Sequence, residues 1–244
     1  MDLARRIGTT LVLMGVLSGN LWGDPPPPLL VCGVALGFPP YQFSTPTGEP
    51  TGIDADVARL VFRELGQGFV FRQTAWDDLY LELAHQSKTV DVLCGAEVNP
   101  ERQALFDFTI PYYQRAVAVF VKKDSPYRSA KDLTGKLVAG DRGGFIETLI
   151  AAQDLRLRST ASKEESFQML QEGRVEAVMA PVGVGFWISR QRGLGVRTLP
   201  EQDPGSPVAF AVAKGNADLA ARISAALAKL KARGQIEAVI RRYR

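Results

Sequence analysis

The sequence predicts an α/β fold built around buried strands. Residues 29–36 and 90–94 form almost unbroken apolar runs of strand length, which is typical of parallel strands covered on both faces. Between them, residues 54–65 place apolar side chains at helical spacing, and Gly66 follows as a helix stop. Strands that alternate with amphipathic helices favour a layered α/β architecture.

The first 23 residues have the layout of a secretory signal peptide. Arg5 and Arg6 precede an apolar stretch, residues 7–17, that is too short for a stable membrane span. We expect cleavage after Gly23 and export to the periplasm; the alternative is a retained N-terminal anchor helix. The proline run in residues 24–28 then forms an extended spacer before the fold.

Composition excludes several classes of function. A net charge of +3 is too small to indicate a partner nucleic acid, and an apolar fraction of 46% is ordinary for a globular protein. One histidine, His85, and two cysteines, Cys32 and Cys94, make a clustered metal site improbable on numbers alone. No nucleophile elbow, metalloprotease helix or phosphate-binding loop occurs, so we expect neither a metal nor a cofactor.

Two segments before residue 90 carry aromatic residues: the loop after the first strand, and the junction between the next strand and its helix. The segment FPPYQF, residues 38–43, follows the first strand, and we expect Tyr41 and Phe43 to pack in the core. Asp54 is the expected cap of the helix that follows. A short strand, residues 69–72, leads to Trp76, after which a helix begins at Asp77.

Residues 90–113 carry the features that indicate a binding site. Gly95 is expected to end a buried strand, and ligands of parallel sheets bind beyond the carboxyl ends of strands. Pro100 suits the first turn of a short helix, with Asn99 as its cap. That helix directs Arg102 back toward the strand end. An arginine side chain is a fixed-charge fork that can hold a carboxylate through two hydrogen bonds.

The second half of the chain repeats the alternation of strands and helices. Gly143 and Gly144 would free backbone amides at a helix start, which is an arrangement suited to anions. We expect strands at residues 116–121, 137–140, 175–180 and 208–213, and helices after Ser162 and Asn216. The arginines that end the chain are expected to be a solvated helix terminus.

The order of strand, glycine, Pro-Glu-Arg, Phe-Asp-Phe-Thr and Pro-Tyr-Tyr resembles the family 3 solute-binding proteins, the periplasmic receptors of polar amino-acid ABC transporters. The resemblance implies a type II periplasmic-binding-protein fold: two lobes, each a five-stranded mixed sheet flanked by helices, joined by two crossing strands. Lobe 1 would comprise residues 24–117 and 207–244, and lobe 2 residues 118–206. The lobes would close on the ligand by a hinge motion.

The same resemblance implies a set of ligand-binding residues. In this family, the arginine at position 102 grips the α-carboxylate, the aromatic residue at position 38 stacks on the ligand, and position 76 forms the opposite wall. The expected site contains Phe38, Trp76, Gly95, Ala96, Glu97, Arg102, Asp141, Gly144 and Phe145. The chain departs from the family at Pro181, where amino-acid receptors carry an aspartate that binds the ammonium group.

Glu97 is a further departure, because the family offers a small hydroxyl residue there. Two interpretations stay open. Glu97 could pair internally with Arg102 and weaken the clamp, or it could replace the missing ammonium-binding acid, with Asp141 as a second candidate.

The expected function is that of a monomeric, exported receptor that binds a small-molecule ligand and delivers it to an inner-membrane ABC permease. Cyclohexadienyl dehydratases look like members of the same fold family, so one alternative is a lyase that uses Glu97 as its cleft acid. A second alternative is a detached ligand-sensing module. The two cysteines could form a disulfide after export, but neighbouring parallel strands seldom offer that geometry, so we expect buried free thiols.

Overall fold

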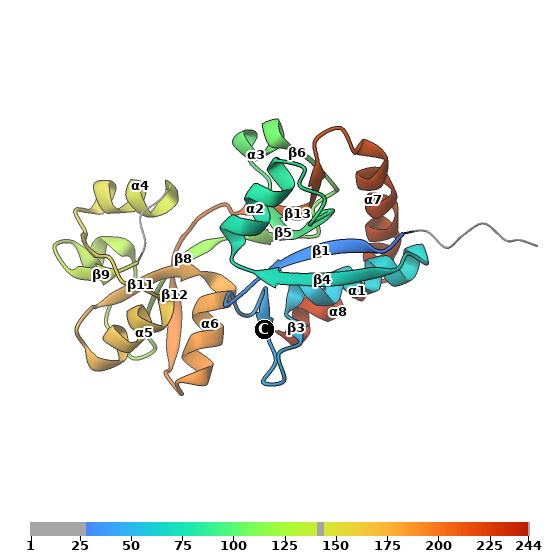
Figure 1. Cartoon of the computed structure of the whole chain (residues 1–244). Coiled ribbons are helices and arrows are strands. Elements are labelled where there is room, and N and C mark those ends of the chain that lie inside the picture. Colours follow the sequence, from blue (N-terminus) through green and yellow to red (C-terminus); the bar gives the residue numbers. More distant parts are fainter. Residues whose placement is uncertain (1–27, 141–143, 244) are drawn as a thin grey trace, which may run out of the picture.

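The computed structural model describes residues 28–140 and 144–243, which form two α/β lobes joined by crossing segments (Figure 1). The expected signal peptide and Asp141 lie outside these residues. Within the same ranges, no helix has both the length and the apolar character needed to cross a membrane. This arrangement of two sheets in two lobes agrees with the fold that the family resemblance implies.

The first lobe is built on a mixed sheet with strand order β4-β1-β5-β13-β6, to which β7 adds by pairing with β13. Its strands are β1 (Leu30–Ala35), β4 (Phe69–Thr74), β5 (Val92–Glu97), β6 (Phe106–Phe108), β7 (Tyr113–Arg115) and β13 (Ser206–Ala213). β1 runs parallel to both β4 and β5, whereas β13 is antiparallel to its neighbours. The sixth strand, β7, was not expected, because a three-residue strand gives almost no periodic signal.

Helices cover both faces of this sheet (Figure 1). They are α1 (Ile53–Leu65), α2 (Trp76–Ala84), α3 (Pro100–Leu105), α7 (Ala217–Ala232) and α8 (Gln235–Arg242); a small hairpin of β2 (Phe43–Ser44) and β3 (Pro50–Thr51) precedes α1. α1, α7 and α8 enclose one core cluster with the sheet, and α2 covers a second cluster on the opposite face.

The second lobe has strand order β10-β9-β11-β8-β12. Its elements are β8 (Val117–Lys122), the 3-10 turn Ala130–Leu133, β9 (Leu137–Ala139), α4 (Gly144–Gln153), β10 (Arg156–Arg158), α5 (Lys163–Glu172), β11 (Ala177–Pro181), α6 (Val182–Gln191) and β12 (Val196–Gln202). α5 and α6 pack on one face of this sheet, and α4 lies toward the other.

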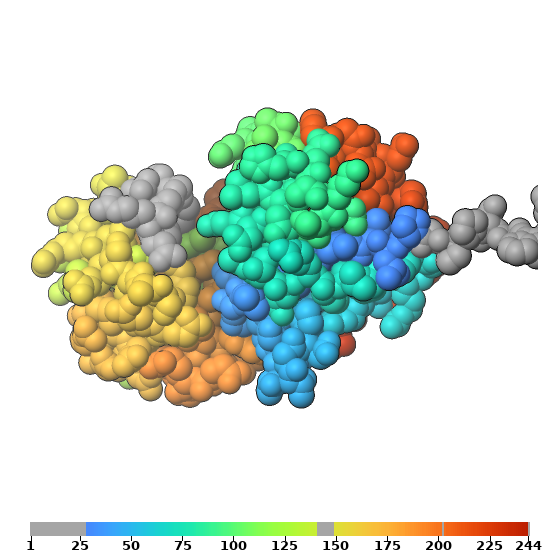
Figure 2. Space-filling model, in the orientation of Figure 1, coloured from blue at the N-terminus to red at the C-terminus, as the bar shows by residue number. Residues whose placement is uncertain are grey.

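The two lobes are distinct bodies in the space-filling view, where the yellow and orange surface of the second meets the blue and teal surface of the first (Figure 2). The chain passes between the two sheets at Ala116 and again at residues 203–205. Side chains of the two lobes are in contact across this boundary. Phe43, for example, is only partly buried and packs against Trp187 of α6, with ring centres 5.2 Å apart.

Two of the expected helix caps are confirmed. The side chain of Asn99 accepts a hydrogen bond of 2.8 Å from the amide of Arg102, and Ser162 accepts one of 3.1 Å from Glu165. Asn216 occupies the cap position of α7 without a side-chain hydrogen bond. The cap predicted at Asp54 was wrong, because α1 begins at Ile53 after Gly52. Asp54 instead turns its carboxylate into the interior, where it is fully buried.

Cys32 and Cys94 lie on the neighbouring strands β1 and β5, and both thiols are free and fully buried. Burial raises the pKa of the Cys94 thiol well above its usual range, which keeps it protonated and unreactive. We therefore expect the folded protein to resist thiol reagents. Denaturation without reductant should expose two reactive thiols per chain, and a denatured monomer with none would contradict the free-thiol state.

Candidate functional site

Five residues that the sequence placed in the binding site line one cleft of ≈ 380 Å³ at the carboxyl end of β5. They are Phe38, Trp76, Gly95, Glu97 and Arg102. Ala96 does not line this cleft. It joins the core cluster beneath α2, because successive side chains of a strand point to opposite faces of the sheet.

Gly95 determines how closely polar groups approach the strand. Its φ angle is +73°, and a Cβ atom there would lie 2.0 Å from Oδ2 of Asp54, so no other residue fits. We expected the strand to end at this glycine, but β5 continues to Glu97 through an irregularity opposite β13. A glycine bulge re-aims a strand without ending it, and here the extension carries Glu97 to the cleft.

Arg102 is held at the cleft by its backbone and by Trp76. The capped start of α3 positions its amide, and its Nη1 donates a hydrogen bond of 3.2 Å to the carbonyl oxygen of Glu97. The guanidinium carbon lies 5.7 Å from the centre of the Trp76 ring. Among the described residues, no carboxylate forms an ion pair with Arg102. Its remaining N–H groups can therefore serve a ligand carboxylate.

A second arginine, Arg115 at the end of β7, also lines the cleft. Only 8% of its side chain is exposed, and its Nη1 donates to Oε1 of Glu97 at 3.2 Å. Its guanidinium also lies 4.4 Å from the centre of the Tyr41 ring and 5.1 Å from that of Phe38. The Nε of Arg115 is buried without a hydrogen-bond partner in the described part of the chain.

Glu97 thus has a different partner from the one that sequence reasoning considered. Its carboxylate pairs with Arg115, and only its backbone oxygen contacts Arg102. The interpretation that Glu97 forms an internal ion pair with Arg102 is therefore wrong. About a third of the Glu97 side chain, 32%, remains exposed in the cleft.

Asp54 supports Arg115 from below. Its Oδ2 lies 3.6 Å from Nη2 of Arg115, and it accepts hydrogen bonds from Tyr112 at 2.7 Å and Gln42 at 2.8 Å. Burial raises the pKa of the Asp54 carboxyl, and Arg115 and these hydrogen bonds oppose the rise. Arg102, Arg115, Glu97 and Asp54 therefore form one connected network. Of its two arginines, only Arg102 has no carboxylate partner among the described residues.

The comparisons with known proteins agree with this geometry. The model of the bacterial extracellular solute-binding proteins, family 3, matches residues 30–244. The chain belongs to that family. ABC transporter arginine-binding protein 1 of Escherichia coli (strain K12) is 28% identical to this solute-binding protein over 235 residues, which cover 94% of this chain and 96% of the relative.

Two further comparisons widen the range of relatives. L-cystine-binding protein TcyJ of the same E. coli strain is 25% identical over 219 residues, covering 88% of this chain and 82% of the relative. Among solved structures, an ancestral arginine-binding protein bound to arginine has a TM-score of 0.71 and 29% identity, with 88% of this chain and 97% of that chain covered.

On the second lobe, the solute-binding protein offers fewer described groups to the cleft. Asp141 and Gly143 lie outside the described residues, Gly144 begins α4, and the side chain of Phe145 is not described. Pro181 ends β11 and occupies the cap position of α6. A proline side chain offers no carboxylate at this point of the second lobe.

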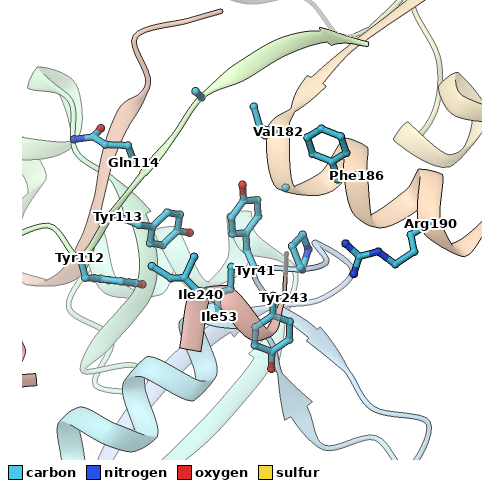
Figure 3. Close-up of a pocket in the computed structure, with 13 residues that line it drawn as sticks. Tyr41, Ile53, Tyr112, Tyr113, Gln114, Val182, Phe186, Arg190, Ile240 and Tyr243 are labelled. Atoms are coloured by element: carbon cyan, nitrogen blue, oxygen red, sulfur yellow. The ribbon is translucent and has the colours of Figure 1, made fainter. Parts of the chain in front are cut away.

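A larger cavity of ≈ 800 Å³ lies between the lobes, and Tyr41 is one of the residues that line it (Figure 3). It shares no lining residue with the cleft that contains Arg102. Tyr41 itself is almost fully buried, as expected. The cavity is lined by none of the residues that were expected to bind the solute.

Sequence reasoning missed Arg115 and Gln42. An arginine two residues after the Pro-Tyr-Tyr motif carries no local signal, because its role depends on the lateral order of strands. The only available indication was its charge next to a strand that was expected to be buried, where a charge needs a partner.

Proposed function

We propose that this solute-binding protein captures an amino acid or a related small organic acid in the cleft and delivers it to an inner-membrane ABC permease. The observation that carries the proposal is the placement of Arg102 and Glu97 in one cleft with Phe38 and Trp76. Arg102 would hold the α-carboxylate, and the exposed part of Glu97 would take the ammonium role that Pro181 cannot fill. The two aromatic rings would cover the ligand's apolar surface.

The names of the relatives support this class of ligand. Arginine and cystine have different side chains, but both carry an α-carboxylate and an α-ammonium group. The comparison therefore supports recognition of the amino-acid backbone and leaves the side-chain preference to be measured.

In the proposed mechanism, binding closes the hinge, and the permease recognises the closed form. The expected lobes, residues 24–117 with 207–244 and residues 118–206, need a shift of one residue at each crossing, because Val117 pairs in the second sheet and Ser206 in the first. We therefore assign residues 24–116 and 206–244 to one lobe and residues 117–205 to the other. We further propose that residues 1–23 are removed on export and that the receptor acts as a periplasmic monomer.

A thermal-shift screen of the purified protein tests the proposal. A ligand that binds only the folded state stabilises it by about 2.7 kcal/mol at a hundredfold excess over Kd. We expect at least one amino acid to raise the melting temperature, and its decarboxylated analogue to have little effect. If no amino acid or small organic acid stabilises the protein, the proposed function is wrong.

Glu97→Gln tests the role of the cleft acid. The substitution keeps the side-chain size but removes the negative charge, so it should weaken binding of the amino acid found in the screen. The analogue without the α-amino group should bind as before or more tightly. Calorimetric titration of both ligands measures the difference, and an equal effect on the two would contradict an ammonium-binding role for Glu97.

In the lyase alternative Glu97 would act on the substrate, whereas its carboxylate is already paired with Arg115 at 3.2 Å. Both E. coli relatives, the arginine-binding and the L-cystine-binding protein, are named as binding proteins. We therefore expect no turnover of prephenate by the purified protein, and measurable turnover would favour the enzyme instead.

A further inference from the structure

We propose that the larger cavity between the lobes is a second small-molecule site, which takes a monocarboxylate with an aromatic or branched apolar body. The cavity, ≈ 800 Å³ in volume, is large enough for such a molecule. Figure 3 shows its side chains converging from the aromatic loop, the crossing segment, α6 and the C-terminal end of α8. The proposal does not depend on which solute binds in the smaller cleft.

The walls of this hinge cavity are mainly aromatic. The rings of Tyr41 and Tyr113 are stacked, with centres 5.5 Å apart and planes 8° from parallel. Tyr112 and Tyr243 direct their hydroxyl groups to Asp54 and Asp56, at 2.7 Å and 2.9 Å. Because these hydroxyls are engaged by carboxylates, the tyrosines contribute largely apolar ring surface to the cavity.

The charge of the lining fixes the class of ligand. Thirteen residues line the cavity; none is acidic, and Arg190 is the one cation among them. Arg190 is exposed on α6, and it forms no ion pair or side-chain hydrogen bond with the described residues. Figure 3 shows its guanidinium extending toward the cavity. A carboxylate is the complement of an unpaired guanidinium, since the two can form paired hydrogen bonds.

Phe186 strengthens the case for a bound apolar group. It lies one helical turn before Arg190 and is 39% exposed, although it also packs against Phe120 with ring centres 5.2 Å apart. A ligand that pairs its carboxylate with Arg190 could cover this ring with its apolar body. A cavity lined mostly by apolar and aromatic side chains, with a few polar groups, is typical of a small-molecule site.

Both lobes contribute to the cavity, so its shape depends on the angle between them. Val182 and Phe186 belong to the second lobe, whereas the tyrosines belong to the first. At Gly183, a Cβ atom would lie 2.7 Å from the Tyr41 hydroxyl, so the lobes already touch there. Arg115 lines the cleft and lies over the Tyr41 ring, which separates the two sites.

Phenylacetate is a suitable probe, with phenethylamine as its charge-reversed counterpart. Titration of the full-length protein by saturation-transfer NMR should show binding of the acid and much weaker binding of the amine. Arg190→Gln should weaken the binding of phenylacetate by about two- to fivefold, as expected for one exposed charge contact. The control is Arg192→Gln, which removes a partly buried arginine that donates a hydrogen bond to Gln171 and does not line the cavity. This substitution should leave the affinity for phenylacetate unchanged.

Arg102→Ala distinguishes the two sites. If phenylacetate occupies the hinge cavity, its affinity should survive this substitution in the cleft. Loss of phenylacetate binding in Arg102→Ala would place the acid in the cleft and overturn the proposal. Equal affinities for acid and amine, or an Arg190→Gln protein that binds as well as wild type, would also overturn it, as would absence of binding to the wild-type protein. Melting temperatures of the variants check that each is folded.

Discussion

Arg115→Met should lower the free energy of unfolding by about 3–5 kcal/mol, the cost of leaving a buried charge without its partner. The substitution removes the cation that faces Asp54 and Glu97, and the Asp54 side chain has no exposed surface. Methionine fills a similar volume, so the loss is mainly electrostatic. Urea unfolding followed by tryptophan fluorescence measures the change.

Arg72→Met is the matched control for this prediction. Arg72 forms an ion pair with Glu82, but 42% of its side chain is exposed, so its loss should change the free energy of unfolding far less than the loss of Arg115. Combining Arg115→Met with Asp54→Asn should recover part of the stability, because the unpaired charge is then removed as well. An Arg115→Met protein as stable as the Arg72→Met control would show that the network contributes little.

Arg102→Ala should weaken binding of the amino acid found in the screen by roughly 10- to 150-fold, corresponding to about 1.5–3 kcal/mol for a hydrogen-bonded charge. Arg102 has no carboxylate partner among the described residues and is only partly buried, so the melting temperature without ligand should change little. Calorimetric titration gives the affinity directly.

Arg102→Lys refines the same experiment. Lysine keeps the charge but loses the planar fork, so its affinity should lie between those of wild type and alanine. A folded Arg102→Ala protein that binds the amino acid as tightly as wild type would disprove the clamp, even if the cleft is the binding site.

The sequence alone determined the features that depend on neighbours along the chain. The caps formed by Asn99 and Ser162 were predicted because a cap and its helix are adjacent in sequence. The cleft residues Phe38, Trp76 and Arg102 were identified through the family resemblance. They meet because each follows a strand, and the carboxyl ends of neighbouring parallel strands share one sheet edge.

Tertiary structure alone decided the electrostatics of the site. Glu97 and Arg115 come from β5 and β7, which pair with opposite edges of β13, so their contact depends on an antiparallel strand that comes much later in the chain. Only that lateral order reveals that Arg115, and not Arg102, neutralises Glu97. The hinge cavity has the same origin, since its walls come from segments that meet only when both lobes have folded.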